Sequence, residues 1–215
     1  MLTHTSGLRD WGAVEGIVGW PRTSRAYTHA HVLDIVSRQR TTNFPPGSAY
    51  SYSNTGYNLA AVLVSRVSGK SFADFTREVL FEPLGMTRTS WRDDFTRVVR
   101  DRSIASDVSP SGAVAMDMPF ENVHGNGGLL TTVGDLLKWN ENAVHAKVGG
   151  RSLIDLQRET MRLTSGEKIE YAFDLRVSSW KRVPEVSHSS ATAGYRAWLA
   201  QYPTKQLSVA VLCNA

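Results

Sequence analysis

In the middle of the chain, apolar residues recur at three- and four-residue steps, the spacing of one face of a helix. The clearest run predicts a helix between Asn54 and Gly69, because asparagine, or the threonine after it, can cap a helix and glycine can end one. The same period predicts helices over residues 31–39, 71–83, 132–149 and 153–163.

From residue 171 the period becomes two, which predicts a half-buried strand over residues 171–177. Two further strands, near 195–202 and 207–212, flank a short turn and should pair as a hairpin. Residues 9–30 and 88–124 show no sustained period and are interpreted as irregular surface segments. The pattern therefore predicts a mixed α+β (α/β) protein with a helical middle region and C-terminal antiparallel strands.

Composition narrows the function classes. The 215 residues include a single cysteine, Cys213, which excludes a scaffold built on intramolecular disulfides. The longest uncharged apolar run, residues 59–64, is far shorter than the about 18 residues of a membrane span. The net charge of +4 is dispersed, and the densest basic stretch, residues 88–102, is interleaved with aspartates. We expect no membrane span and no nucleic-acid partner.

Tyr52 and Asn54 form the strongest local constellation of polar side chains. They lie on a turn between a Pro-Pro-Gly bend and a helix start, two residues apart, so both side chains can leave the same face of an extended segment. A phenol and a carboxamide side by side could bind a substrate amide and move a proton. The phenol has an ordinary pKa of about 10, so it becomes a base at neutral pH only beside cations. The alternative is structural, with Asn54 capping the helix and Tyr52 packing.

A second constellation is His188-Ser189-Ser190-Ala191, at the mouth of a strand. A histidine beside small residues could place its ring over a substrate while backbone N–H groups bind an oxyanion. The alternative is a lone surface histidine.

Two other motifs carry less chemistry. His29 and His31 have ligand spacing for a strand, but no cysteine or carboxylate cluster accompanies them, so we expect no metal site. Residues 125–128 lack the lysine of a phosphate loop and predict a turn. We expect no cofactor.

Four stretches, taken in order, resemble one family: LTHTSGL at 2–8, FPPG at 44–47 with YSNTGY at 52–57, EPLGMT at 82–87 and GGL at 127–129. The chain is similar from Met1 to Ala215 to the serine β-lactamase and penicillin-binding protein superfamily. The similar branch holds class C β-lactamases, D-Ala-D-Ala carboxypeptidases and related esterases. The resemblance implies a β-lactamase/transpeptidase-like fold in one domain over residues 1–215.

The resemblance also implies roles for the candidate residues. The family's Tyr-x-Asn motif falls on Tyr52, its general base or acid, and on Asn54, which binds the substrate amide. The family's Lys/His-Thr/Ser-Gly motif falls on His188 and Ser189, with Ser190 standing where the family has glycine. In the same register, the N–H of Ala191 is one of two oxyanion donors.

The family's Ser-x-x-Lys motif supplies the nucleophile and its activating cation from a helix that precedes the LTHTSGL stretch. We therefore expect that helix, the family's first strands and its closing C-terminal helix to be absent from this chain. Two other matches, Ser165 to Lys168 and Ser178 to Lys181, are predicted to lie on turns or strands. An uncovered sheet face would then be open to self-association.

The leading hypothesis is part of a serine hydrolase that acts by acyl transfer on an ester, an amide or a β-lactam, with a small-molecule or peptide substrate. The alternative is a non-catalytic remnant or binding module of the same fold. A basic surface-binding protein is a third hypothesis, and the dispersed charge argues against it. Family members are commonly exported, but this sequence shows no signal peptide, so the compartment stays open.

Overall fold

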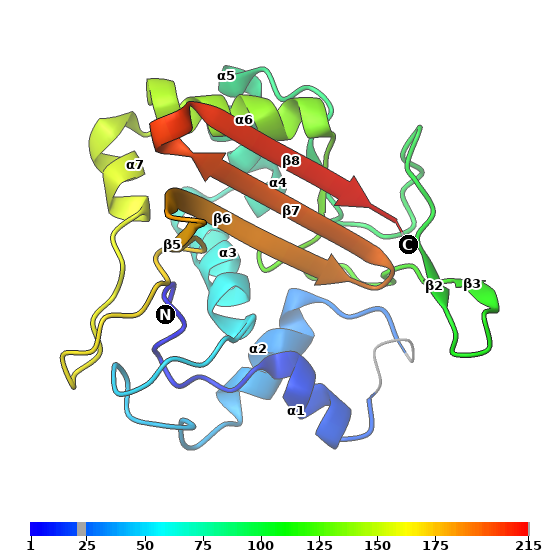
Figure 1. Ribbon diagram of the computed structural model, residues 1–215. Coiled ribbons are helices and arrows are strands. Elements are labelled where there is room, and N and C mark those ends of the chain that lie inside the picture. Colours follow the sequence, from blue (N-terminus) through cyan, green and yellow to red (C-terminus); the bar gives the residue numbers. More distant parts are fainter. Residues whose placement is uncertain (21–24, 215) are drawn as a thin grey trace.

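The computed structural model describes residues 1–20 and 25–214, and its main feature is a four-stranded antiparallel sheet (Figure 1). The sheet has the order β5-β6-β7-β8. Its strands are β5 (Arg176–Trp180), β6 (Val183–Thr192), β7 (Tyr195–Tyr202) and β8 (Leu207–Cys213). Each strand follows its neighbour in sequence, because tight turns join them. The expected mixed α+β architecture, with helices first and antiparallel strands last, is confirmed.

Two details of the predicted sheet were wrong. The strand expected over residues 171–177 begins only at Arg176, because Asp174 takes a left-handed backbone conformation (φ 57°) that interrupts an extended run. Strand β6 was not predicted as a strand. It begins with a proline at its second position, and its polar stretch from Ser187 to Ser190 hides the alternation of period two.

In the view of Figure 1 the helices lie behind, beside and below the sheet. They are α1 (Trp11–Ile17), α2 (His29–Ser37), α3 (Thr55–Ser68), α4 (Phe72–Thr76), α5 (Glu82–Leu84), α6 (Val133–His145) and α7 (Gly150–Gln157), with a π-helical turn η1 (Arg77–Phe81) and a 3-10 turn η2 (Pro203–Lys205). In the part of the chain described, no helix has the length and apolar character needed to span a membrane.

Helix α1 corrects the expectation that residues 9–30 are irregular. Asp10 caps it by accepting a hydrogen bond from the N–H of Ala13, and Trp11 is buried at its first position. Two glycines in seven residues conceal the helical period. Residues 21–24 of the same segment lie outside the described residues.

Helix α3 has its expected bounds and ends at Gly69 in the left-handed conformation. Its buried side, however, is not the aliphatic face. Leu63 and Val67 are 56% and 80% exposed, whereas the helix buries small and polar side chains, namely Thr55, Gly56, Asn58 and Ala61. The period predicted the helix but not the side that packs.

A small core joins the N-terminal helices to the segment that follows the long loop. Its buried members are Trp11, Tyr27, Val32, Ile35 and Val123. Tyr27 is fully buried, and its hydroxyl donates to the carbonyl of Trp20 at 2.6 Å. This core holds α1 and α2 beneath the cleft described below.

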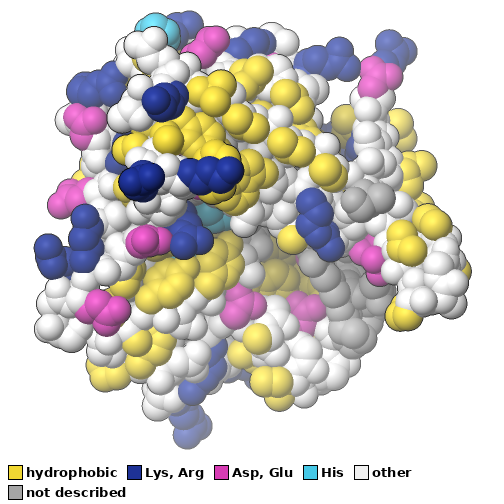
Figure 2. Space-filling model, viewed as in Figure 1, with side chains coloured by type: hydrophobic (Ala, Val, Ile, Leu, Met, Phe, Trp, Pro, Cys, Tyr) yellow, Lys and Arg dark blue, Asp and Glu magenta, His cyan; other side chains and the backbone are white. Residues whose placement is uncertain are grey.

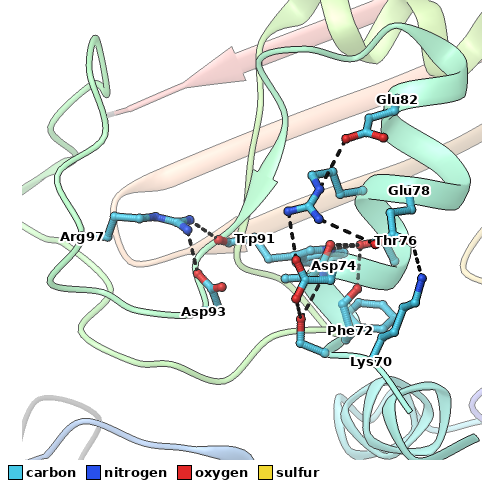
Figure 3. A network of polar contacts seen from close by, with 12 residues as sticks. Lys70, Phe72, Asp74, Thr76, Glu78, Glu82, Trp91, Asp93 and Arg97 are labelled. Atoms are coloured by element: carbon cyan, nitrogen blue, oxygen red, sulfur yellow. Dashed lines mark hydrogen bonds and ion pairs between the residues drawn. The ribbon is translucent and has the colours of Figure 1, made fainter. Parts of the chain in front are cut away.

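A polar network ties α4 and η1 to the next segment (Figure 3). The indole N–H of Trp91 donates to Thr76 Oγ1 at 2.8 Å, while Arg77 forms ion pairs with Asp74, Glu78 and Glu82. Trp91 lies in β1 (Ser90–Trp91), which pairs with β4 (Leu129–Leu130). The network therefore supports the turn before β4.

Part of the charged stretch at 88–102 is internally paired. Arg88 contacts Asp101 at 3.1 Å and Arg97 contacts Asp93 at 3.0 Å, and all four side chains are exposed. Arg92 differs, because it is buried and pairs with Glu121 outside the stretch. Further along, β2 (Ser106–Val108) and β3 (Val114–Met116) form a short hairpin that extends from the body of the molecule (Figure 1).

One face of the main sheet packs on α6, where Gln201 donates to Asn140 Oδ1 at 2.8 Å. The opposite face is open, and Figure 2 shows hydrophobic side chains gathered over it. Strand register places four exposed apolar residues on this face: Trp180, Trp198, Leu207 and Val211.

Candidate functional site

A cleft of about 1150 Å³ lies between α1, the segment at 50–54 and the end of β6. It is lined by Tyr52 and Asn54 from one side and by residues 188–191 from the other. The two constellations singled out in the sequence are thus brought together in one hollow. Lining residues that the sequence did not single out include Asp10, Glu121, Tyr171 and Trp198.

The N-terminal segment positions the Tyr52–Asn54 turn from behind. The N–H of Ser51 donates to the carbonyl of His4 at 2.9 Å, and the N–H of Ser53 donates to His4 Nδ1 at 3.1 Å. Gly7 lets the same segment pack closely on the chain at Phe44, because its φ is +73° and a Cβ there would lie 2.3 Å from the carbonyl oxygen of Phe44. The LTHTSGL stretch therefore serves as the support of the turn.

Asn54 is held by Asp10 rather than by the helix it precedes. Asp10 Oδ2 accepts hydrogen bonds from the backbone N–H of Asn54 at 2.7 Å and from its Nδ2 at 3.0 Å. Asn54 occupies the N-cap position of α3 but makes no side-chain capping bond, so the capping alternative was wrong. With its Nδ2 bound to Asp10, the carboxamide keeps its oxygen for another partner.

Tyr52 lies against the ring of His4, with centroids 4.2 Å apart, and its side chain remains partly exposed to the cleft. Burial, then the negative charge of Asp174, then Tyr50 and Asp10, raise the pKa of Tyr52 to about 12. The same two leading causes raise the pKa values of Tyr57 and Tyr171. Tyr52 in this chain is therefore a phenol at neutral pH, a proton donor rather than a base.

This state of Tyr52 can be measured. We expect ¹³C NMR of the Tyr52 Cζ to show ionisation of less than about a tenth at pH 11, since the group titrates near 12. Asp174→Asn removes the second-largest cause and is expected to lower the midpoint. Tyr52→Phe assigns the signal, and a midpoint near pH 10 in the unchanged chain would contradict the argument.

The end of β6 offers unpaired backbone groups to the cleft. Strand β5 pairs with β6 only from Val183 to Ser187, and β6 continues to Thr192. Thr192 and Tyr195 are the hydrogen-bonded pair that closes the two-residue turn to β7. From this pair onwards, non-hydrogen-bonded and hydrogen-bonded residue pairs alternate along the two strands. The N–H groups of Ser189 and Ala191 consequently point away from β7, towards the free edge. This edge geometry suits binding of an oxyanion or an extended substrate.

The ring of His188 contacts a polar cluster in the wall of the cleft. Its Nε2 lies 3.0 Å from the Tyr171 hydroxyl and 3.4 Å from Asp174 Oδ1. The Tyr171 hydroxyl also meets His4 Nε2 at 3.2 Å. Neither Tyr171 nor Asp174 was singled out in the sequence, where both lay inside a predicted strand.

The remaining sequence candidates lie elsewhere. His29 Nε2 contacts the carbonyl of His124 at 2.8 Å, and His31 Nδ1 accepts from the N–H of Thr28 in a capping box. Burial and the neighbouring His29 lower the pKa of His124 to about 4. Within residues 1–20 and 25–214, no group of three or more potential ligands is arranged to hold a metal ion.

Comparison with known proteins decides the family. The model of the family described as Beta-lactamase matches residues 1–215, the whole chain. The chain belongs to the Beta-lactamase family. A D-aminopeptidase from Gluconobacter oxydans (strain 621H) is 25% identical over 214 residues, covering 99% of this chain and 40% of the relative. A penicillin-binding protein from Bacillus subtilis (strain 168) is 26% identical over 234 residues, covering 100% and 50%. The chain thus spans about half the length of these curated relatives or less.

Solved structures agree on the fold of this Beta-lactamase family chain. The octameric penicillin-binding protein homologue from Pyrococcus abyssi aligns with a TM-score of 0.84 at 24% identity, over 100% of this chain and 50% of that one. The D-amino acid amidase from Ochrobactrum anthropi SV3, complexed with L-phenylalanine amide, aligns with a TM-score of 0.77 at 18% identity, over 99% and 62%. The expected β-lactamase/transpeptidase-like fold is confirmed.

Proposed function

We propose that this chain forms two walls of an acyl-transfer site of a serine hydrolase that acts on an ester, an amide or a β-lactam. The observation that carries the proposal is the shared cleft, in which the Tyr52–Asn54 turn faces residues 188–191 across a volume of about 1150 Å³. A carboxamide acceptor, a phenol and a free strand edge are the groups needed to bind and polarise an acyl group.

In this proposal each wall has a task. Asn54 binds the substrate amide, and Tyr52 exchanges a proton with the nucleophile or the leaving group. His188 and Ser189 bind the substrate beside the strand edge, Ser190 replaces the family's glycine there, and the N–H of Ala191 is one oxyanion donor. The domain, over residues 1–215, receives a nucleophile and its lysine from a Ser-x-x-Lys helix outside this sequence. The substrate is a small molecule or a peptide.

Tyr52 connects the missing cation to the chemistry. Its phenol has a pKa of about 12 in this chain, with two carboxylates among the causes. A lysine placed beside it would favour the phenolate and lower the pKa of the phenol towards neutral pH. The proposal therefore requires that lysine for base catalysis, as it requires the serine for acylation.

The proposal is tested by reading the coding DNA before Met1 for an in-frame Ser-x-x-Lys segment and expressing the longer product. Turnover is then measured on a chromogenic ester, a D-amino acid amide and a cephalosporin. Tyr52→Phe is expected to lower kcat on the order of 10²-fold or more. Tyr202→Phe, which removes a hydroxyl bound to Glu185, is the matched control. Equal kcat for Tyr52→Phe and the unchanged enzyme would refute the role of Tyr52.

A second candidate is a non-catalytic binding module of the same fold. It is favoured by the position of both Ser-x-x-Lys matches, since Ser165 lies in a turn and Ser178 in β5. A stop codon shortly before Met1, together with saturable binding of a product amide without turnover, would support it. The open sheet face, with Trp198 and Val211 exposed, is where such a module would associate with a second copy.

A further inference from the structure

A chain of hydrogen bonds lies behind the cleft and joins its two walls. At its centre is the hydroxyl of Tyr171, a buried residue. This oxygen lies 3.2 Å from His4 Nε2, 3.0 Å from Asp174 Oδ1 and 3.0 Å from His188 Nε2. His4 continues the chain, because its Nδ1 accepts the N–H of Ser53 in the Tyr52–Asn54 turn.

The donors and acceptors permit one consistent placement of protons. A phenol offers one proton and accepts two, and a carboxylate only accepts, so the Tyr171 proton goes to Asp174. His4 accepts at Nδ1, so its neutral ring carries the proton on Nε2 and donates to Tyr171. Burial lowers the pKa of His4, which agrees with a neutral ring.

The third contact of the hydroxyl is then settled by elimination. With its proton committed and one lone pair filled, the Tyr171 oxygen can only accept from His188 Nε2. His188 Nε2 also lies 3.4 Å from Asp174 Oδ1. If Nε2 carried no proton, its lone pair would face a lone pair of the carboxylate oxygen, which is unfavourable. Every position on the hydroxyl is occupied, which makes the arrangement rigid.

The backbone at Asp174 supports a specific task for its carboxylate. Its φ of 57° is the left-handed conformation, which costs energy for a residue with a side chain. Glycine would adopt this conformation without cost, yet the chain places there a carboxylate that accepts from Tyr171. Such strain persists where surrounding contacts determine it and gathers at functional sites.

We propose that Tyr171, oriented by Asp174 and His4, is a positioning residue that holds the ring of His188 with a proton on Nε2 directed at the Tyr171 hydroxyl. The same chain couples the Tyr52–Asn54 turn to β6, so the two walls of the cleft keep one relative orientation. The idea rests on the proposed function, in which His188 binds substrate. Its test observes the His188 ring directly and needs no turnover. A failure of the positioning role of Tyr171 is therefore distinguishable from a failure of the proposed hydrolase function.

The test is ¹H–¹⁵N NMR of the histidine rings in the 215-residue chain at neutral pH. We expect the His188 ring proton on Nε2, and we expect its exchange with water to be at least about tenfold slower than in Tyr171→Phe. Tyr50→Phe is the matched control, because that ring lies 5.5 Å from Tyr171 and takes no part in the hydrogen-bond chain. It should leave the His188 proton protected.

A second variant covers the case in which Tyr171→Phe does not fold. Asp174→Ala removes the acceptor of the Tyr171 proton from a side chain that is 45% exposed, so the buried ring stays in place. It should release the protection, and Asp174→Asn, which keeps an acceptor oxygen, should retain most of it. A His188 ring without a proton on Nε2, or equal exchange in the unchanged chain, Tyr171→Phe and Asp174→Ala, would overturn the proposal.

Discussion

The purified 215-residue chain is expected to hydrolyse a chromogenic ester, a D-amino acid amide or a cephalosporin no faster than buffer does. The acyl transfer proposed above uses a serine and a lysine one helical turn apart, so that the amine can activate the hydroxyl. Removing the nucleophile alone lowers turnover on the order of 10⁶-fold in a well-studied serine protease. No arrangement of Tyr52 and Asn54 replaces that loss.

The two Ser-x-x-Lys matches in the chain do not form such a pair. Ser165 lies in a turn, and the chain leaves it towards an isolated bridge between Arg162 and Lys168. Ser178 lies in β5, and Lys181 occupies the turn to β6 with a φ of 47°. Neither segment is helical, so neither serine lies one helical turn from its lysine.

The measurement uses stopped assays over hours, with mass spectrometry to detect an acylated serine. Ser165→Ala and Ser178→Ala are the controls for any residual rate. Saturable hydrolysis that persists in both serine variants and disappears in Tyr52→Phe would show that the chain holds a nucleophile of another kind. Burst kinetics in the unchanged chain would contradict the prediction directly.

Local signals in the sequence were sufficient to place most of the helices after α1 and the last hairpin. Ser71 and Thr132, at the starts of the helices predicted over 71–83 and 132–149, accept hydrogen bonds from the N–H groups three residues on. Local signals were insufficient where tertiary packing decides which side of a helix is buried. Helix α3 buries Asn58 and Ala61 instead of Leu63 and Val67, because the neighbouring segment approaches closely: Asn58 Nδ2 donates to the carbonyl of His124 at 3.0 Å.

The candidate site divides in the same way. Tyr52, Asn54 and His188 could be found because motifs of local spacing contain them. The residues that hold them, Asp10 and Tyr171, could not be found, because each acts across 44 or 17 residues of sequence. A tyrosine in an alternating run reads as a strand residue, and only the folded chain places its hydroxyl between two histidines.

Breaking the buried ion pair beneath the cleft is expected to destabilise the fold strongly. Arg92 Nη2 contacts Glu121 Oε1 at 3.1 Å, with side chains only 3% and 9% exposed. Arg92 also donates from Nε to the carbonyl of Glu121 at 2.8 Å, and its own N–H donates to the carbonyl of Gly128 at 2.8 Å. Both Glu121 and Gly128 line the cleft, so this pair fixes part of its floor.

Glu121→Gln is expected to lower the free energy of unfolding by about 3 kcal/mol or more, since it removes one charge of a buried ion pair. Urea unfolding followed by circular dichroism measures the change. The matched control is Asp101→Asn, which makes the same chemical change in the exposed pair with Arg88 and should cost less than about 1 kcal/mol.

The double variant Arg92→Met with Glu121→Leu separates charge from packing. Replacing both partners by apolar side chains removes the need to bury either charge, so the double variant should be more stable than Glu121→Gln. If all three variants unfold within about 1 kcal/mol of the unchanged chain, the pair is solvated in solution and the cleft floor depends on other contacts. If the expected order holds, the packing beneath the cleft requires Arg92 to be neutralised, and Glu121 is first of all a structural residue of the cleft.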